Sequence, residues 1–124
     1  NRITSTTNGL LGVLQLARSE AVKQRRSVTV CPSKDLATCD ATADWHEGII
    51  VLLGAEILRT LPAASAGVEI LSARDQLIYQ PTGRRDGADP RYSIEDSRGV
   101  GATSRAVCIN LLGQVRSARG DEGC

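Results

Sequence analysis

The sequence predicts an α+β fold in which one long N-terminal helix packs on antiparallel β-sheet. Three observations predict it. Apolar residues recur at helical spacing through residues 1–26. From residue 27 onward, apolar residues alternate with a period of two in short segments. Turn signals containing Gly or Pro separate these segments. One helix followed by many short strands is typical of the α+β class, and 124 residues suit a single domain.

The expected helix covers Arg2–Arg26. Three basic residues crowd its last turn, where positive charge suits the helix dipole: Lys23, Arg25 and Arg26. Its apolar stripe consists of Ile3, Leu10, Val13, Leu14, Ala17 and Ala21. Three further apolar residues lie off this stripe, namely Leu11, Leu16 and Val22. They are either ordinary exposed apolar residues or a second contact face for partner subunits.

Eight short strands are expected after the helix. They are Ser27–Cys31, Gly48–Leu53, Glu56–Leu61, Val68–Leu71, Gln76–Tyr79, Tyr92–Glu95, Arg105–Asn110 and Gln114–Ser117. The last two would form a C-terminal hairpin around Leu112-Gly113. We expect the helix (1–26) and the β-rich head (27–124) to form one domain.

The composition limits the core and the function. There is no Phe or Met, one Trp and two Tyr, so the core must consist mainly of Leu, Ile, Val and Ala. Such a core buries less area per residue, and covalent cross-links would help it. The net charge of +1 argues against a strongly basic protein that coats nucleic acid.

The four cysteines are Cys31, Cys39, Cys108 and Cys124, and no two have the C-x-x-C spacing of zinc or redox motifs. Two disulfides are therefore expected. Four cysteines allow three connectivities, and the sequence alone does not choose between them. Local pairing, Cys31 with Cys39 and Cys108 with Cys124, would close two short loops. Disulfides indicate a periplasmic or extracellular protein.

Signals for catalysis and for metal or cofactor binding are weak. His46 is the single histidine, and neither a G-x-S-x-G nor an H-E-x-x-H motif occurs. The acidic residues around Asp86 and Asp89 match no standard calcium loop. We therefore expect no enzyme activity, no metal and no cofactor. The lone tryptophan, Trp45, is expected to anchor a loop or the core.

Three phrases, in this order, resemble the FimT/GspH family of type IV minor pilins and type II secretion pseudopilins. The first is the end of the helix, Ala17–Gln24, followed by the strand phrase Val28–Cys31. The second is Trp45–Gly48, which leads into the next strand. The third is Cys108–Arg116, with the pattern C-[IV]-N-x-x-G-[RQ]-V-R. They bracket almost the whole chain, whereas the middle, Ala55–Gly101, matches nothing diagnostic.

The resemblance implies a pilin-like fold and an assembly role rather than catalysis. Residues 1–26 would be the C-terminal half of the long pilin helix. A hydrophobic segment ahead of Asn1 would anchor the subunit in the inner membrane, with the head in the periplasm, and would later join the filament core. The implied partners are other minor pilins and the major pilin, at the pilus tip and cell surface. In this setting Cys31 would tie the first strand to the next loop through Cys39.

DNA is a further implied partner, because some FimT proteins are linked to DNA uptake through a C-terminal G-R-x-R phrase. Here the phrase is Gly113-Gln114-Val115-Arg116, so Gln114 replaces the first arginine. Residues 97–120 contain arginines and no acidic residue, which suits contacts to phosphates. The candidate DNA-binding residues are Arg105, Arg116 and Arg119. A solvent-facing hairpin whose arginines aid solubility or contact the next subunit is the alternative.

Overall fold

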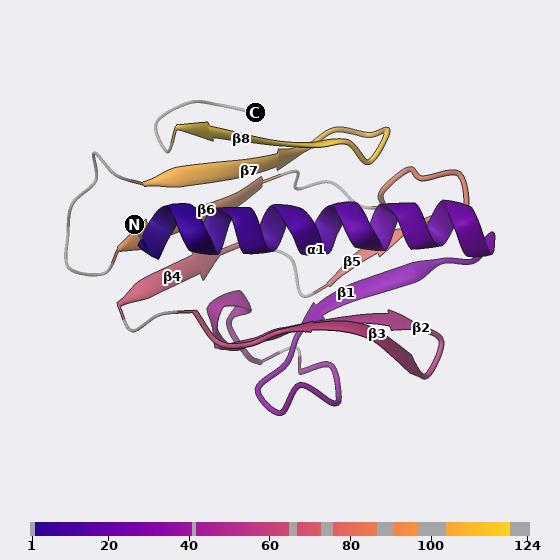
Figure 1. Ribbon diagram of the computed structural model, residues 1–124, viewed down its shortest axis with the longest axis horizontal. Coiled ribbons are helices and arrows are strands. Elements are labelled where there is room, and N and C mark those ends of the chain that lie inside the picture. Colours follow the sequence, from indigo (N-terminus) through magenta and orange to yellow (C-terminus); the bar gives the residue numbers. More distant parts are fainter. Residues whose placement is uncertain are drawn as a thin grey trace.

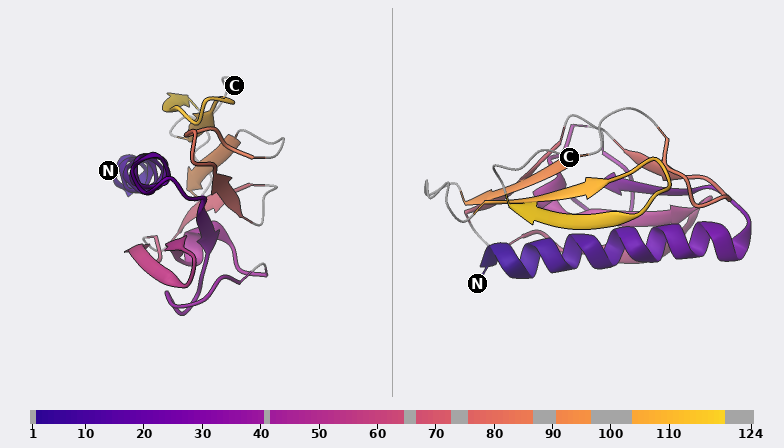
Figure 2. Two further views of the ribbon diagram at one scale, coloured as in Figure 1. Left: turned by 90° about the vertical axis from the view of Figure 1, so that its right-hand side faces the viewer. Right: turned by 90° about the horizontal axis from the view of Figure 1, so that it is seen from above.

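Helix α1 (Arg2–Gln24) lies across one face of a layer of β-strands in the computed structural model of the chain (Figure 1). The structure describes residues 2–40, 42–64, 67–72, 76–86, 91–96 and 104–119. Viewed along the helix axis, the strands all lie on one side of α1 (Figure 2). The described parts of the chain therefore form two layers, one of a single α-helix and one of strands.

The strands agree with the sequence expectation, with ends that shift by no more than two residues. They are β1 (Val28–Pro32), β2 (Ile49–Leu53), β3 (Glu56–Leu61), β4 (Val68–Leu71), β5 (Leu77–Tyr79), β6 (Arg91–Asp96), β7 (Arg105–Ile109) and β8 (Val115–Arg119). A short 3-10 helix, η1 (Trp45–Glu47), precedes β2. Period-two alternation is a local property, which explains why the sequence alone locates these strands.

Within the described residues, the strands form two four-stranded antiparallel sheets rather than one. Their orders are β3-β2-β1-β5 and β4-β6-β7-β8. The sheets lie side by side beneath α1, with β5 and β4 near the middle of the layer (Figure 1). The hairpin expected at the C-terminus is present as β7 and β8, in which Ile109 is the register partner of Val115.

The main apolar core joins the helix to both sheets. All six residues of the expected helical stripe are at most 3% exposed. They belong to one cluster with residues of both sheets, among them Val30 of β1 and Val107 of β7. Burying a side chain of this size contributes about 1.5–3 kcal/mol. The helix therefore holds together two sheets that share no strand pairing in the described parts of the chain.

The helix ends two residues earlier than the sequence predicts, at Gln24 rather than Arg26. Arg25 adopts a left-handed conformation with φ 54°. The amide of Arg26 donates to the carbonyl oxygen of Ala21 at 3.3 Å. This is the hydrogen bond of a Schellman motif, with arginine where glycine is usual. The left-handed residue ends the helix and reverses the direction of the chain, so that β1 begins at Val28.

Candidate functional site

Arg18 connects the helix to two turns that are far apart in the sequence. Its Nε donates to the carbonyl oxygen of Gly83 at 3.2 Å and to that of Leu112 at 3.1 Å. Gly83 lies in the turn after β5, and Leu112 lies in the turn between β7 and β8. One guanidinium on α1 thus fixes one turn from each sheet. The role of Arg18 does not follow from its sequence context, in which it is only a charged residue next to Ala17 of the buried stripe.

Gly113 makes this junction possible. Its φ is 84°, in the region where side chains other than glycine are strained. A Cβ at this position would collide with the carbonyl oxygen of Gly83 and would stand 3.0 Å from Nε of Arg18. The turn between β7 and β8 can therefore approach Arg18 only with glycine here. The Ala17–Gln24 phrase and the Cys108–Arg116 phrase, separated in sequence, meet at this point.

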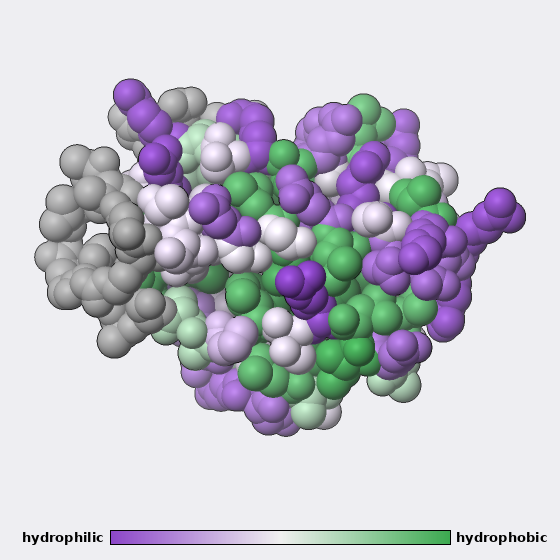
Figure 3. Space-filling view, viewed as in Figure 1, coloured by the Kyte–Doolittle hydropathy of each residue, from purple (hydrophilic) through white to green (hydrophobic). Residues whose placement is uncertain are grey.

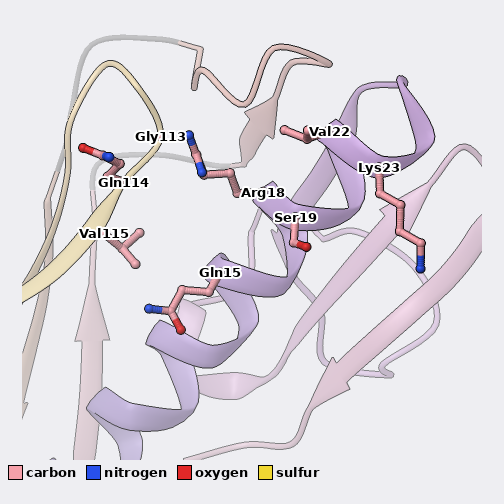
Figure 4. A pocket seen from close by; sticks show the side chains of 8 residues that line it. All are labelled: Gln15, Arg18, Ser19, Val22, Lys23, Gly113, Gln114 and Val115. Carbon is pink, nitrogen blue, oxygen red and sulfur yellow. The ribbon is translucent and has the colours of Figure 1, made fainter.

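A groove of about 540 Å³ opens beside the junction. Figure 4 shows Arg18 reaching from α1 toward Gly113, with Gln114 and Val115 on the strand side. We name it the helix–turn groove and define it by its lining residues, Gln15, Arg18, Ser19, Val22, Lys23, Gly113, Gln114 and Val115. Two of these side chains are cationic and none is acidic.

The Cys31–Cys39 disulfide is confirmed, with the two Cα atoms 5.6 Å apart. Within its loop, the Asp35 carboxylate accepts hydrogen bonds from the amides of Thr38 and Ala37 at 2.9 and 2.8 Å. These bonds, followed by that from the Ser33 hydroxyl, hold the pKa of Asp35 well below its ordinary value, because they favour the charged form. The disulfide therefore stabilises the loop together with the hydrogen bond from Ser33 to Asp35. Ser33 itself is fully buried.

Asp40, beyond the disulfide, forms a second small turn. Its carboxylate accepts from the hydroxyl of Thr42 at 2.6 Å and from the amide of Thr42 at 3.0 Å. These bonds lower the pKa of Asp40. Local carboxylate hydrogen bonds at Asp35 and Asp40 therefore stabilise the described parts of the chain between β1 and η1.

Cys108 lies in β7 and is 4% exposed. Its register partners in the sheet are Arg91 and Arg116. It forms a small buried cluster with Ala106 and Ala118, separate from the main core. Cys124 lies outside the described residues, so the pairing of Cys108 with Cys124 stays a prediction.

Trp45 and His46 hold η1 against the sheet that contains β4 and β6. Trp45 is 3% exposed, and its ring meets that of Tyr92 edge to face, with centroids 4.9 Å apart. The amide of Ile70 donates to Nδ1 of His46 at 3.1 Å. Trp45 is therefore a core anchor, as expected, and His46 takes part in a structural contact to β4. A Cβ at Gly48 would collide with the carbonyl oxygen of Ser33, which explains the glycine of the Trp45–Gly48 phrase.

The three candidate DNA-binding arginines do not share one face of the sheet. Arg105 and Arg119 are direct register partners across β7 and β8, so both leave the sheet on the same side. Arg116 is the register partner of Cys108 and leaves on the opposite side. Sequence spacing grouped the three residues, but strand alternation separates Arg116 from the other two.

The three apolar helix residues off the stripe differ in exposure. Val22 is 47% exposed and lines the helix–turn groove. Leu11 is partly buried and packs against the core, whereas Leu16 is half-buried. Figure 3 shows hydrophobic residues interspersed with hydrophilic ones on this face of the molecule. Leu11 therefore contributes to core packing, and Val22 is the most solvent-exposed of the three residues.

No group of three or more His, Cys, Asp or Glu residues with the geometry of a metal site occurs in the described ranges. Within the same residues, no helix combines the length and apolar character that crossing a bilayer requires.

Comparison with known proteins decides the family. The sequence model of the family described as Type II transport protein GspH matches residues 6–113. The chain belongs to the GspH family. This match includes Arg18, the turn after β5 and the turn up to Gly113, so the junction lies within the region that defines GspH proteins. No curated protein matches the chain closely enough in sequence to count as a relative.

Solved structures of two GspH-like proteins share the fold. The type IV minor pilin FimU of Pseudomonas aeruginosa PAO1 has a TM-score of 0.75 at 25% identity, over 97% of this chain and 90% of that chain. The minor pseudopilin EpsH from the type 2 secretion system of Vibrio cholerae has a TM-score of 0.67 at 12% identity, over 98% and 100%. At that identity, EpsH shows the fold alone. The chain is thus of the minor pilin or minor pseudopilin type, as the three phrases predict.

Proposed function

We propose that this GspH-family chain is a minor pilin of a type IV pilus, a structural subunit of the tip or priming complex that supports pilus assembly, twitching motility and adhesion. The observation that carries the proposal is the comparison with FimU, named as a type IV minor pilin. At similar coverage of this chain, identity to FimU is 25%, against 12% to the pseudopilin EpsH. A type II secretion minor pseudopilin is the alternative within the family.

The mechanism is assembly. The partners are other minor pilins and the major pilin, contacted along α1 and through the surfaces of the head. Before assembly the subunit is held in the inner membrane with its head in the periplasm, and afterwards it lies at the pilus tip. The disulfide that fixes the loop after β1 suits an oxidising compartment.

Loss of the gene tests the proposal. We expect a deletion strain to lose surface pili and twitching, and to recover both when the full-length gene is returned. Secretion of type II substrates should be unchanged. A strain with normal pili but defective secretion would assign the subunit to the secretion pseudopilus instead.

DNA uptake is a second candidate function, supported by one feature of the fold. Arg105 and Arg119 face each other across β7 and β8, which concentrates positive charge on one side of the sheet. Anisotropy titration of purified protein with duplex DNA at low and physiological salt tests it. We expect Arg105→Ala with Arg119→Ala to abolish salt-sensitive binding and Arg116→Ala, on the other side, to weaken it less. Equal losses for all three positions would contradict a site on one face.

A further inference from the structure

The helix–turn groove concentrates positive charge in a nearly neutral chain. The whole chain carries a formal net charge of +1, yet the groove is lined by Arg18 and Lys23 and by no acidic residue. Glu20 lies on the same helix but is not part of the lining, and it accepts from the side chain of Gln24 at 3.5 Å. The field inside the groove therefore favours an anionic group.

Arg18 is held in place before any ligand arrives. Both hydrogen bonds that it forms within the described part of the chain come from Nε, to Gly83 and Leu112. The guanidinium plane is fixed by these bonds, while its terminal amines retain donors for another group. A guanidinium oriented in advance binds a carboxylate at a lower entropic cost than a mobile one.

Polar side chains around Arg18 supply further donors. The side-chain oxygen of Gln114 accepts from Nδ2 of Asn110 at 3.0 Å, and its amide nitrogen carries two further donors. Ser19 and Lys23 line the helical side of the groove. These groups match the hydrogen-bonding needs of a peptide segment that carries a carboxylate.

The groove suits a peptide carboxylate better than nucleic acid. It offers two cations, whereas a protein that follows a phosphate backbone presents a longer row of them. No aromatic side chain lines it on which a base could stack. Its volume of about 540 Å³ accommodates a few side chains.

We propose that the helix–turn groove binds an acidic segment of a neighbouring filament subunit, with a carboxylate of that subunit paired to Arg18. This inference rests on the proposed assembly function, and it names the chemistry by which the head recognises its neighbour. Gln114 belongs to the lining on the strand side of the groove, so a charge at this position should change the strength of binding.

Two variants of one residue test the electrostatics with matched size. Gln114→Glu places a carboxylate in the lining of the groove and should weaken binding of an acidic partner by about tenfold, whereas Gln114→Lys should preserve or strengthen it. The probe is an acetylated and amidated peptide of alternating Asp and Glu, and its Asn/Gln counterpart is the neutral control. NMR amide shifts report the location of binding, and thermal melting confirms that each variant is folded.

We expect acidic-peptide shifts confined to the groove residues, reduced by salt and by Gln114→Glu, and absent with the neutral peptide. Arg59→Glu, which changes the charge by two units on β3 outside the groove, should leave them unchanged. Shifts spread over all basic surfaces, or no shifts, would overturn the proposal. Tighter binding of a short DNA duplex to the same residues would overturn the assignment of the partner as protein.

A test in cells separates this inference from the proposed function. If the gene deletion abolishes piliation and Gln114→Glu abolishes it while Gln114→Lys and Arg59→Glu do not, the groove is an assembly contact. If the deletion abolishes piliation but Gln114→Glu supports normal pili, the groove proposal fails and the minor pilin function stands. If the deletion leaves pili intact, the proposed function fails.

Discussion

At the scale of single residues, Arg18 illustrates how one side chain can organise a fold. Its Nε bonds reach turns that are 65 and 94 residues away in the sequence. Both acceptors are carbonyl oxygens, so the contact depends on the backbone of the turns and not on their side chains. The side chain at position 112 can therefore vary as long as the turn keeps its shape, whereas position 83, with φ 87°, favours glycine.

Replacement of Arg18 by Ala should destabilise the protein by about 1–2 kcal/mol, because two carbonyl groups lose a shared charged donor. Urea unfolding followed by circular dichroism measures the loss. Lys23→Ala, a loss of the same charge on the same helix but outside these hydrogen bonds, should change stability by less than about 0.5 kcal/mol. Equal effects of the two substitutions would show that the Nε bonds contribute nothing specific.

Replacement of Gly113 by Ala should cost about 2 kcal/mol or more, since φ is 84° and the new Cβ would meet the carbonyl oxygen of Gly83. Gly12 gives a matched comparison. It lies in the interior of α1, and a Cβ there would meet nothing within 4 Å. Gly12→Ala should therefore stabilise the protein by about 0.5–1 kcal/mol. Melting temperatures that move in opposite directions would confirm both parts.

Asp35 should make the disulfide loop sensitive to acid. Its pKa is lower in the folded chain than in the unfolded chain, where an ordinary carboxyl titrates near pH 4. The stabilisation is complete above that unfolded value and is lost as the pH falls through it toward the folded value. An NMR titration should give an Asp35 midpoint well below 4. The stability difference between wild type and Asp35→Asn should shrink over the same range; a constant difference would contradict this account.

At the scale of the elements, the end of α1 carries a residue with a conformational cost. Arg25 occupies the left-handed position of a Schellman motif, where a side chain costs about 1 kcal/mol relative to glycine. The residue is exposed, so its side chain offers little packing in return. The positive charge of Arg25 interacts favourably with the helix dipole at the C-terminus of α1, and this offsets part of the conformational cost.

Arg25→Gly should therefore raise the free energy of unfolding by about 0.5–1 kcal/mol. Lys23→Gly is the control, because it places glycine within the helix and should lower stability by about 1 kcal/mol. Denaturant titration of both variants measures the two changes. A loss of stability in Arg25→Gly would mean that the charge of Arg25 outweighs the strain of its backbone.

At the scale of the whole molecule, each sheet carries a cysteine on the face away from the helix. Cys31 is the register partner of Ile50, and Cys108 is the register partner of Arg116. None of these four residues belongs to the main core under α1. The Cys31–Cys39 bond holds the loop after β1 against the first sheet. The expected Cys108–Cys124 bond would act in the same way on the second sheet.

Removal of the first bond by Cys31→Ser with Cys39→Ser should cost about 2.5 kcal/mol, as expected for a loop with a sequence separation of 8. Thermal melting of the oxidised wild type and the variant measures it. Non-reducing peptide mapping by mass spectrometry tests the second bond, with a Cys108–Cys124 cross-linked peptide as the expected product. Recovery of Cys108 as a free thiol would contradict the pairing.

The sequence by itself determined the helix, the eight strands and the family, because stripe spacing, alternation and short phrases are all local. It located every strand within two residues, and it placed Trp45 correctly as an anchor. Only the tertiary structure decided how the strands divide into two sheets, that Arg18 joins both of them, and that Arg116 faces away from Arg105 and Arg119. The physical reason is that pairing and long-range hydrogen bonds join residues far apart in the chain, where no sequence period connects them.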